Sequence, residues 1–213
     1  AASLAALFKA PVAAIIFAVE VIMIDLTAAS LVPLLLASLT ALITAELFLG
    51  NENVLSTPVL ENFELSRLPL YLLLGLVCAV GSVVFSKVYL AASHAVASMR
   101  TPRIRIWVAG GLVGAAVVFF PSLYGEGYEV VNGLFGGHSK LLAGDMTLNQ
   151  LDPEGWWLIG VLLLAWLLKP ILTGMTVGAG GVAGIFAPAI FCGALLGYVY
   201  ALGLEQVFGT EVI

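Results

Sequence analysis

The most informative part of the sequence is Val177-Gly178-Ala179-Gly180-Gly181-Val182-Ala183-Gly184-Ile185-Phe186-Ala187-Pro188. Four glycines fall within seven residues of this stretch, between two segments made almost entirely of apolar residues. This pattern predicts a helix broken at membrane depth, where irregular backbone is tolerated only inside protein or beside a watery cavity. The N–H groups and the positive dipole end at such a break favour a bound anion. The stretch therefore predicts an anion site made of backbone.

The composition places the chain in a membrane. Of its 213 residues, 62% are hydrophobic and 10% are charged, and the mean hydropathy is +1.12. Several apolar runs reach the roughly 18–20 residues that span a bilayer. We therefore expect an all-α, multi-pass membrane protein of the cell membrane, with the lipid bilayer as its surroundings. The chain begins and ends at apolar helix edges, so we expect it to be an internal part of a longer protein.

Prolines, glycines and charges divide the apolar sequence into segments. Pro11 and Pro33 suit the first turns of helices, because proline lacks the N–H that a first turn leaves unpaired. The segment 51–67 is polar and lies outside the hydrocarbon, and a second, glycine-rich polar interval covers 122–155. We expect helices over residues 11–23, 30–49, 68–99, 106–120, 127–134, 156–173 and 184–203.

The charges of the loops predict an orientation. The turn 100–105 carries three arginines and no acidic residue, whereas the segment 51–67 carries three glutamates and one arginine. By the positive-inside rule, the basic turn is cytoplasmic and the acidic segment is external. The helix at 30–49 then runs outward, and the helix at 68–99 runs inward.

Small residues recur at a helical spacing in two places. Gly110 and Gly114 are four residues apart, and so are Gly193 and Gly197. Glycines at this spacing let helix backbones approach closely in lipid. We therefore expect all four to be packing positions.

Two lysines lie within or beside apolar segments. Lys9 precedes Pro11, and we expect its ammonium to reach the cytoplasmic interface; the alternative is that it raises the anion concentration near a pore mouth. Lys169 precedes Pro170 and has the same two interpretations, an interfacial position or a position in a vestibule.

Three segments, in order along the chain, carry a family resemblance. They are Phe8-Lys9-Ala10-Pro11-Val12-Ala13-Ala14-Ile15-Ile16-Phe17-Ala18-Val19-Glu20, Tyr124-Gly125-Glu126-Gly127-Tyr128 and Gly184-Ile185-Phe186-Ala187-Pro188. They resemble, respectively, the FNAPLAGxxFxxE segment, the turn before a short half-helix and the GxFxP signature of the CLC family of chloride channels and chloride/proton antiporters. The first segment departs from the family pattern at Lys9, where asparagine is usual. The resemblance covers essentially the whole chain.

The resemblance implies a homodimer with one pore per subunit, built from two inverted halves of tilted and broken helices. Residues 1–50 would end the first half, and residues 68–213 would form most of the second half. Ile185 and Phe186 would supply the backbone N–H groups that bind chloride or a related halide, where Gly184 opens the helix. The serine loop, the gating-glutamate loop and the C-terminal tyrosine of the family lie outside this chain. We therefore expect the chain to hold one wall of the anion site and not to conduct alone.

Glu20 lies in an apolar helix, where an ionisable residue is a functional candidate. The resemblance aligns it with the first of two adjacent glutamates in the antiporters. Val21 aligns with the second, the internal proton-relay glutamate. The absence of this relay glutamate favours a passive chloride channel of the voltage-gated type, in which Glu20 is structural. The alternative is a proton-coupled chloride or fluoride antiporter with another proton route.

The other reactive residues give no catalytic or metal site. Cys78 and Cys192 lie inside apolar helices, where packing thiols are common. His94 and His138 have no partner at a metal-binding spacing. An intramembrane hydrolase needs a nucleophile with a base, or an HExxH set, and no such arrangement is present. A structural or receptor role leaves the glycine break unexplained. We expect no enzyme, no cofactor, no metal and no nucleic-acid partner.

Overall fold

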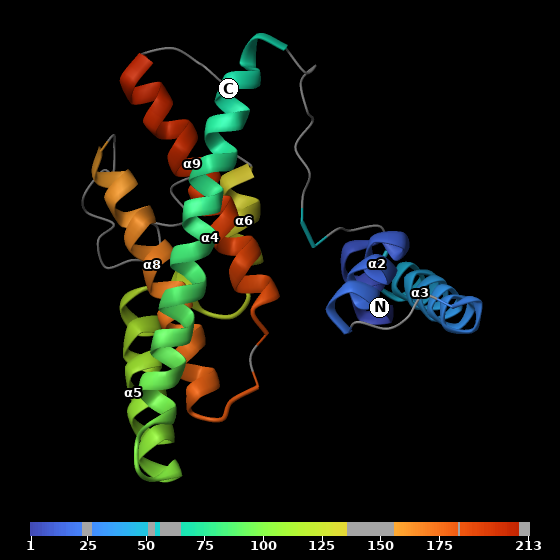
Figure 1. Cartoon of the computed structure of the whole chain (residues 1–213), viewed down its shortest axis with the longest axis horizontal. Helices are drawn as coiled ribbons and strands as arrows, with labels where there is room; N and C mark the ends of the chain where they lie inside the picture. Colours follow the sequence, from blue (N-terminus) through green and yellow to red (C-terminus); the bar gives the residue numbers. More distant parts are fainter. Residues whose placement is uncertain (23–26, 51–53, 56–64, 136–155, 183, 209–213) are drawn as a thin grey trace. The chain divides into compact units, whose positions relative to one another are not determined.

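The computed structural model of the chain describes residues 1–22, 27–50, 54–55, 65–135, 156–182 and 184–208 (Figure 1). The regular structure in these ranges is helical, which confirms the expected all-α class. Contacts divide the chain into two compact units, residues 1–57 and 58–213. Five of the described helical segments are long and apolar enough to span a membrane: Ser30–Leu49, Leu65–Ala97, Pro102–Phe119, Trp156–Gly178 and Phe186–Val207.

The first unit consists of three helices that pack against one another. Their contacts involve small side chains, since Ala5, Ala14 and Ala18 are all buried. Small residues bring helix backbones together where lipid supplies no hydrophobic drive for association. The three helices are α1 (Ala2–Phe8), α2 (Pro11–Ile22) and α3 (Ala28–Leu49).

The helix α3 begins two residues before the predicted Ser30. A capping box sets this start, because the Thr27 side chain accepts from the backbone N–H of Ser30, and the Ser30 side chain accepts from the backbone N–H of Thr27. Such reciprocal bonds satisfy two first-turn donors. Pro33 therefore lies inside the helix and not in its first turn.

Lys9 ends α1 in the left-handed region, with φ 51°. Its ammonium donates to the carbonyl oxygen of Gly50 at 2.8 Å. Gly50 caps the C-terminus of α3, where the helix dipole favours a cation. Gly50 also adjoins the segment 51–67, which is expected to be external. The cytoplasmic position expected for Lys9 is therefore incompatible with the predicted orientation of α3.

The second unit is built around α8. Half of its membrane-spanning stretch is buried, against 6% for those of α4 and α5. Leu162, Phe191 and Leu195 have no exposed surface and form the core where α8 meets α9. The hydroxyl of Tyr200 on α9 donates to the carbonyl oxygen of Leu70 on α4 at 2.8 Å. The helices of this unit (Figure 1) are α4 (Leu68–Ala97), α5 (Pro102–Phe119), α6 (Tyr128–Phe135), α8 (Trp156–Gly178) and α9 (Phe186–Phe208).

Two glycines let α8 approach α4 closely. A Cβ atom added to Gly174 would overlap the carbonyl oxygen of Tyr89, and one added to Gly178 would overlap the carbonyl oxygen of Ser93. Because the two glycines are four residues apart, they lie on one face of α8. They form a small-xxx-small contact against the α4 backbone.

The glycine pairs that the spacing predicted as packing positions behave differently. A Cβ atom added at any of them would meet no other described atom within 4 Å; they are Gly110, Gly114, Gly193 and Gly197. Close approach at these positions is thus not seen within the described part of the chain. Spacing identifies one face of a helix, but it does not identify which neighbour covers that face.

The glycine-rich stretch closes one helix before it opens the next. The N–H of Gly180 donates to the carbonyl of Val177, and the N–H of Gly181 donates to that of Thr176, both at 2.9 Å. With Gly180 at φ +96°, these bonds form a Schellman motif that satisfies the last carbonyls of α8. The helix α8 therefore continues past the predicted residue 173 to Gly178. The helix α9 begins at Phe186, two residues after the predicted start.

Pro170 lies inside α8 without ending it. Proline has no N–H to donate to the carbonyl four residues earlier, which is that of Trp166. The Cys192 thiol of α9 lies 3.6 Å from this carbonyl oxygen and donates to it. Cys192 is therefore a packing thiol, as expected, with a specific hydrogen bond between the two helices.

The predicted orientation can be checked by labelling. The basic turn 100–105 follows α4, where Arg105 donates from Nε to the carbonyl of Met99 at 2.9 Å. We expect a cysteine at Thr101 in the full-length protein to resist a membrane-impermeant thiol reagent applied outside intact cells. A cysteine at Glu52, in the acidic segment, should react. Rapid labelling at Thr101 with none at Glu52 would reverse the orientation.

Candidate functional site

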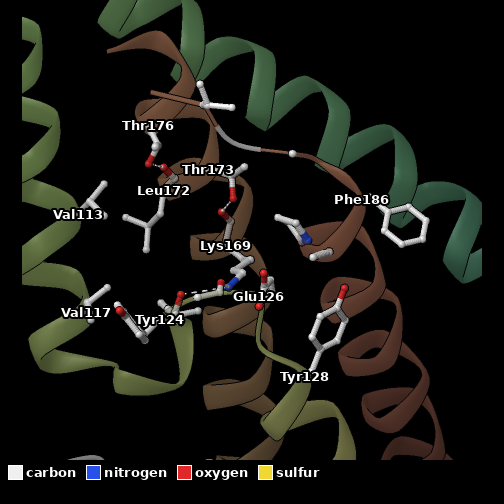
Figure 2. Close-up of a pocket in the computed structure, with 16 residues that line it drawn as sticks. Val113, Val117, Tyr124, Glu126, Tyr128, Lys169, Leu172, Thr173, Thr176 and Phe186 are labelled. Carbon is white, nitrogen blue, oxygen red and sulfur yellow. Dashed lines mark hydrogen bonds between the residues drawn. The ribbon is translucent and has the colours of Figure 1, made fainter. Parts of the chain in front are cut away.

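A cavity of about 530 Å³ lies in the second unit in front of the N-terminus of α9 (Figure 2). Its walls come from α5, from the turn between α5 and α6, from α8 and from the start of α9. The lining residues are Val113, Val117, Leu123, Tyr124, Gly125, Glu126, Tyr128, Lys169, Leu172, Thr173, Thr176, Val182, Gly184, Phe186, Ala187 and Pro188. The cavity thus joins the second and third motifs of the sequence in one space.

Lys169 is the cation of this cavity. Its side chain is only 3% exposed, and its ammonium donates to the carbonyl oxygens of Leu123 at 3.0 Å and Gly125 at 2.8 Å. The ammonium also lies 4.8 Å from the centre of the Phe191 ring, a cation–π distance. Both hydrogen-bond acceptors are neutral carbonyls. The positive charge is therefore held in place without being cancelled by these partners.

The hydroxyl groups of the cavity include those of Thr173, Thr176 and Tyr128. Thr173 donates to the carbonyl of Lys169 and Thr176 donates to that of Leu172, each at 2.9 Å, so their protons are used within α8. Burial raises the pKa of the Tyr128 hydroxyl, and the nearby Glu126 charge raises it further. Tyr128 therefore stays protonated at neutral pH.

The electrostatics of the cavity favour an anion. The first turn of an α-helix directs its N–H groups and the positive end of its dipole out of the N-terminus. The N-terminus of α9 opens at this cavity through Phe186 and Ala187, while Pro188 contributes no N–H. Lys169 adds a full positive charge to the same space. Glu126, which is exposed at the turn, opposes both.

The predicted anion-site residues divide between the cavity and its edge. Gly184 and Phe186 line the cavity, whereas Ile185 does not and its side chain is 52% exposed. Of the four glycines in the glycine-rich stretch, Gly184 alone lines the cavity. Gly178 packs on α4, and Gly180 with Gly181 closes α8.

The predicted proton-relay positions lie in the first unit. Glu20 is on α2 and is exposed. Val21 is also on α2, but its side chain lies outside the described residues, as does the whole of His138. Within the described ranges, no group of three or more His, Cys, Asp or Glu side chains could hold a metal ion.

The two hydrogen bonds from Lys169 to the carbonyls of Leu123 and Gly125, called the clamp below, were not predicted. The sequence signal was present, since Lys169 is the one ionisable residue among the apolar residues 156–178, a position that marks function in membrane helices. Its partners, however, lie 46 and 44 residues earlier in the chain. No local pattern connects residues that far apart, so the pairing emerges only from the fold.

Comparisons with known proteins give a family for this arrangement. The family model described as voltage gated chloride channel matches residues 1–213. A ClcB-like protein of Ralstonia nicotianae, named as a chloride channel protein, is 31% identical over 97% of this chain and 44% of its own length. The H(+)/Cl(-) exchange transporter ClcA of Vibrio campbellii is 29% identical over 100% of this chain and 43% of its own length.

A plant relative extends the comparison. The chloride channel protein CLC-f of Arabidopsis thaliana is 28% identical over 100% of this chain and 27% of its own length. No solved structure matches significantly. The chain thus spans less than half the length of these curated relatives. With the family model matching throughout, the chain belongs to the voltage gated chloride channel family.

Proposed function

We propose that the protein carries chloride or a related halide across the cell membrane, and that this chain forms one wall of the permeation path. One observation carries the proposal: the N-terminus of α9 and the buried ammonium of Lys169 converge on one cavity. Among the relatives, both a chloride channel protein and an H(+)/Cl(-) exchange transporter are similar to this chain. The proposed role is transport and not catalysis, and it needs no cofactor besides the ion.

The anion would bind through backbone. Ile185 and Phe186 would donate their N–H groups to a halide at the start of α9, and Gly184 would let it approach without a Cβ atom in the way. A fixed set of backbone donors suits permeation, because it replaces hydration without a strongly binding side chain. Residues 1–50 and 68–213 would belong to two inverted halves of a homodimeric protein, with other parts of each subunit completing the pore.

The relatives include both channels and exchangers, and Val21 favours a channel. A coupled exchanger needs a titratable group on the cytoplasmic side of its proton route, and valine cannot carry a proton. The alternative is a chloride or fluoride antiporter in which protons take another route. The two readings differ in whether protons move with the anion.

The experiment is a transport assay of the full-length protein in liposomes. We expect an imposed chloride gradient to drive chloride flux without stoichiometric proton movement, recorded with a pH-sensitive dye. Proton movement that stays tightly coupled after substitution of both Glu20 and Val21 would show another proton route. Coupling abolished by Glu20→Gln alone would assign the relay to Glu20. No chloride flux under any condition would refute the proposed function.

A further inference from the structure

Two opposite charges meet at the cavity in front of α9. Lys169 reaches it from α8 and is buried, whereas Glu126 reaches it from the exposed turn after α5 (Figure 2). The two groups interact electrostatically, and the carbonyl that Lys169 binds most closely belongs to Gly125, the residue before Glu126. Because the Lys169 ammonium binds the residue next to Glu126, it helps to set where the Glu126 carboxylate lies relative to the cavity.

We propose that Lys169 and Glu126 together set the anion affinity of this cavity. Lys169 raises the affinity by its charge and by holding the turn 123–128 in place, and Glu126 lowers it. The inference rests on the proposed function, and it assigns roles to two side chains beside a site otherwise made of backbone.

The clamp explains why the charge of Lys169 acts on the cavity. Two of the three ammonium donors bind carbonyls, and the Phe191 ring, which is fully buried, covers the group. An ammonium fixed in this way has little freedom to turn toward water. In a site of reduced dielectric constant, a unit charge acts more strongly than it does at the surface.

The turn also lies close to the Phe191 ring. Gly127 has φ +85°, and a Cβ atom added to it would lie 2.5 Å from Cδ2 of Phe191. The same aromatic ring therefore contacts both the ammonium and the turn. Lys169, Phe191 and the backbone of the turn therefore form one packed unit, which holds the turn that carries Glu126 beside the cavity.

Glu126 places a negative charge beside the cavity. A carboxylate beside an anion site limits how tightly the anion binds, and permeation requires that the ion can leave as well as enter. Glu129 provides a matched control. It is exposed, like Glu126, and it is on the next element, but it does not line the cavity in front of α9.

The test is calorimetric titration of chloride into the purified full-length protein. We expect Lys169→Met to weaken chloride binding by about tenfold, and Lys169→Arg to restore most of it. Glu126→Gln should strengthen binding by about threefold, while Glu129→Gln should leave it unchanged. Because Glu126 is exposed, its variant tests the charge effect even if Lys169→Met fails to fold.

The outcomes separate this inference from the proposed function. If the unmodified protein binds chloride, and Lys169→Met and Glu126→Gln both bind it with the affinity of the unmodified protein, the inference alone is overturned. A lower melting temperature of Lys169→Met with unchanged chloride affinity also overturns it, because the clamp would then be merely structural. Equal strengthening by Glu126→Gln and Glu129→Gln would show a general surface-charge effect, which contradicts the assignment. No chloride binding in the unmodified protein would refute both proposals.

Discussion

Gly178→Ala is expected to destabilise the protein by about 1–3 kcal/mol, the cost of overpacking a well-packed contact. The added Cβ atom would overlap the carbonyl oxygen of Ser93 and lie 3.0 Å from the Cβ atom of Val96 on α4. The obstacle is backbone, which cannot rotate away as a side chain can. The two helices would have to separate, and α8 carries Lys169 and much of the cavity wall.

Gly197→Ala is the matched control for this prediction. It also replaces a helical glycine, but the added Cβ atom would meet no other described atom within 4 Å. Alanine has a higher helix propensity, so this variant should be neutral or stabilised by up to about 1 kcal/mol. Thermal unfolding of the full-length protein in detergent compares the two variants. Equal changes would mean that the approach of α8 to α4 does not depend on Gly178.

Gly184→Val should reduce chloride affinity by about tenfold to a hundredfold, and Phe186→Leu should change it little. One charge-assisted hydrogen bond is worth about 1.5–3 kcal/mol, so the loss of one accounts for this range. A Cβ atom added at Gly184 would meet no other described atom within 4 Å, so we expect the valine to act mainly on the approaching anion. Leucine at 186 keeps the backbone N–H.

The comparison requires matched expression and the same assay for both variants, either halide titration or flux in liposomes. A larger loss from Phe186→Leu, or equal losses, would show that the side chain of Phe186 carries the site. Loss of thermal stability in Gly184→Val would need to be excluded in parallel, by the melting temperature of the chloride-free protein.

The membrane class and most helices follow from the sequence. Apolar length predicts the spans, and the predicted helices at 68–99 and 127–134 correspond to α4 (Leu68–Ala97) and α6 (Tyr128–Phe135). Element boundaries that depend on hydrogen bonds were less accurate. The Schellman motif at Gly180 extends α8 by five residues beyond the prediction, and the cap at Thr27 lengthens α3.

The site is predicted only in part by the sequence. The GxFxP-like stretch identifies Gly184 and Phe186, and both line the cavity. The composition of the stretch cannot separate a glycine that packs against a helix or ends one from a glycine that lines the cavity. The role of Lys169 depends on carbonyls more than 40 residues away, which only the folded chain brings together.

The position of a bound halide would show whether the anion binds at the N-terminus of α9. Crystals of the full-length protein grown in bromide would locate the ion by anomalous scattering. We expect a bromide peak at the N-terminus of α9, within hydrogen-bonding distance of the backbone nitrogens of Ile185 and Phe186. Bromide bound elsewhere along the pore, with no peak at the N-terminus of α9, would contradict it.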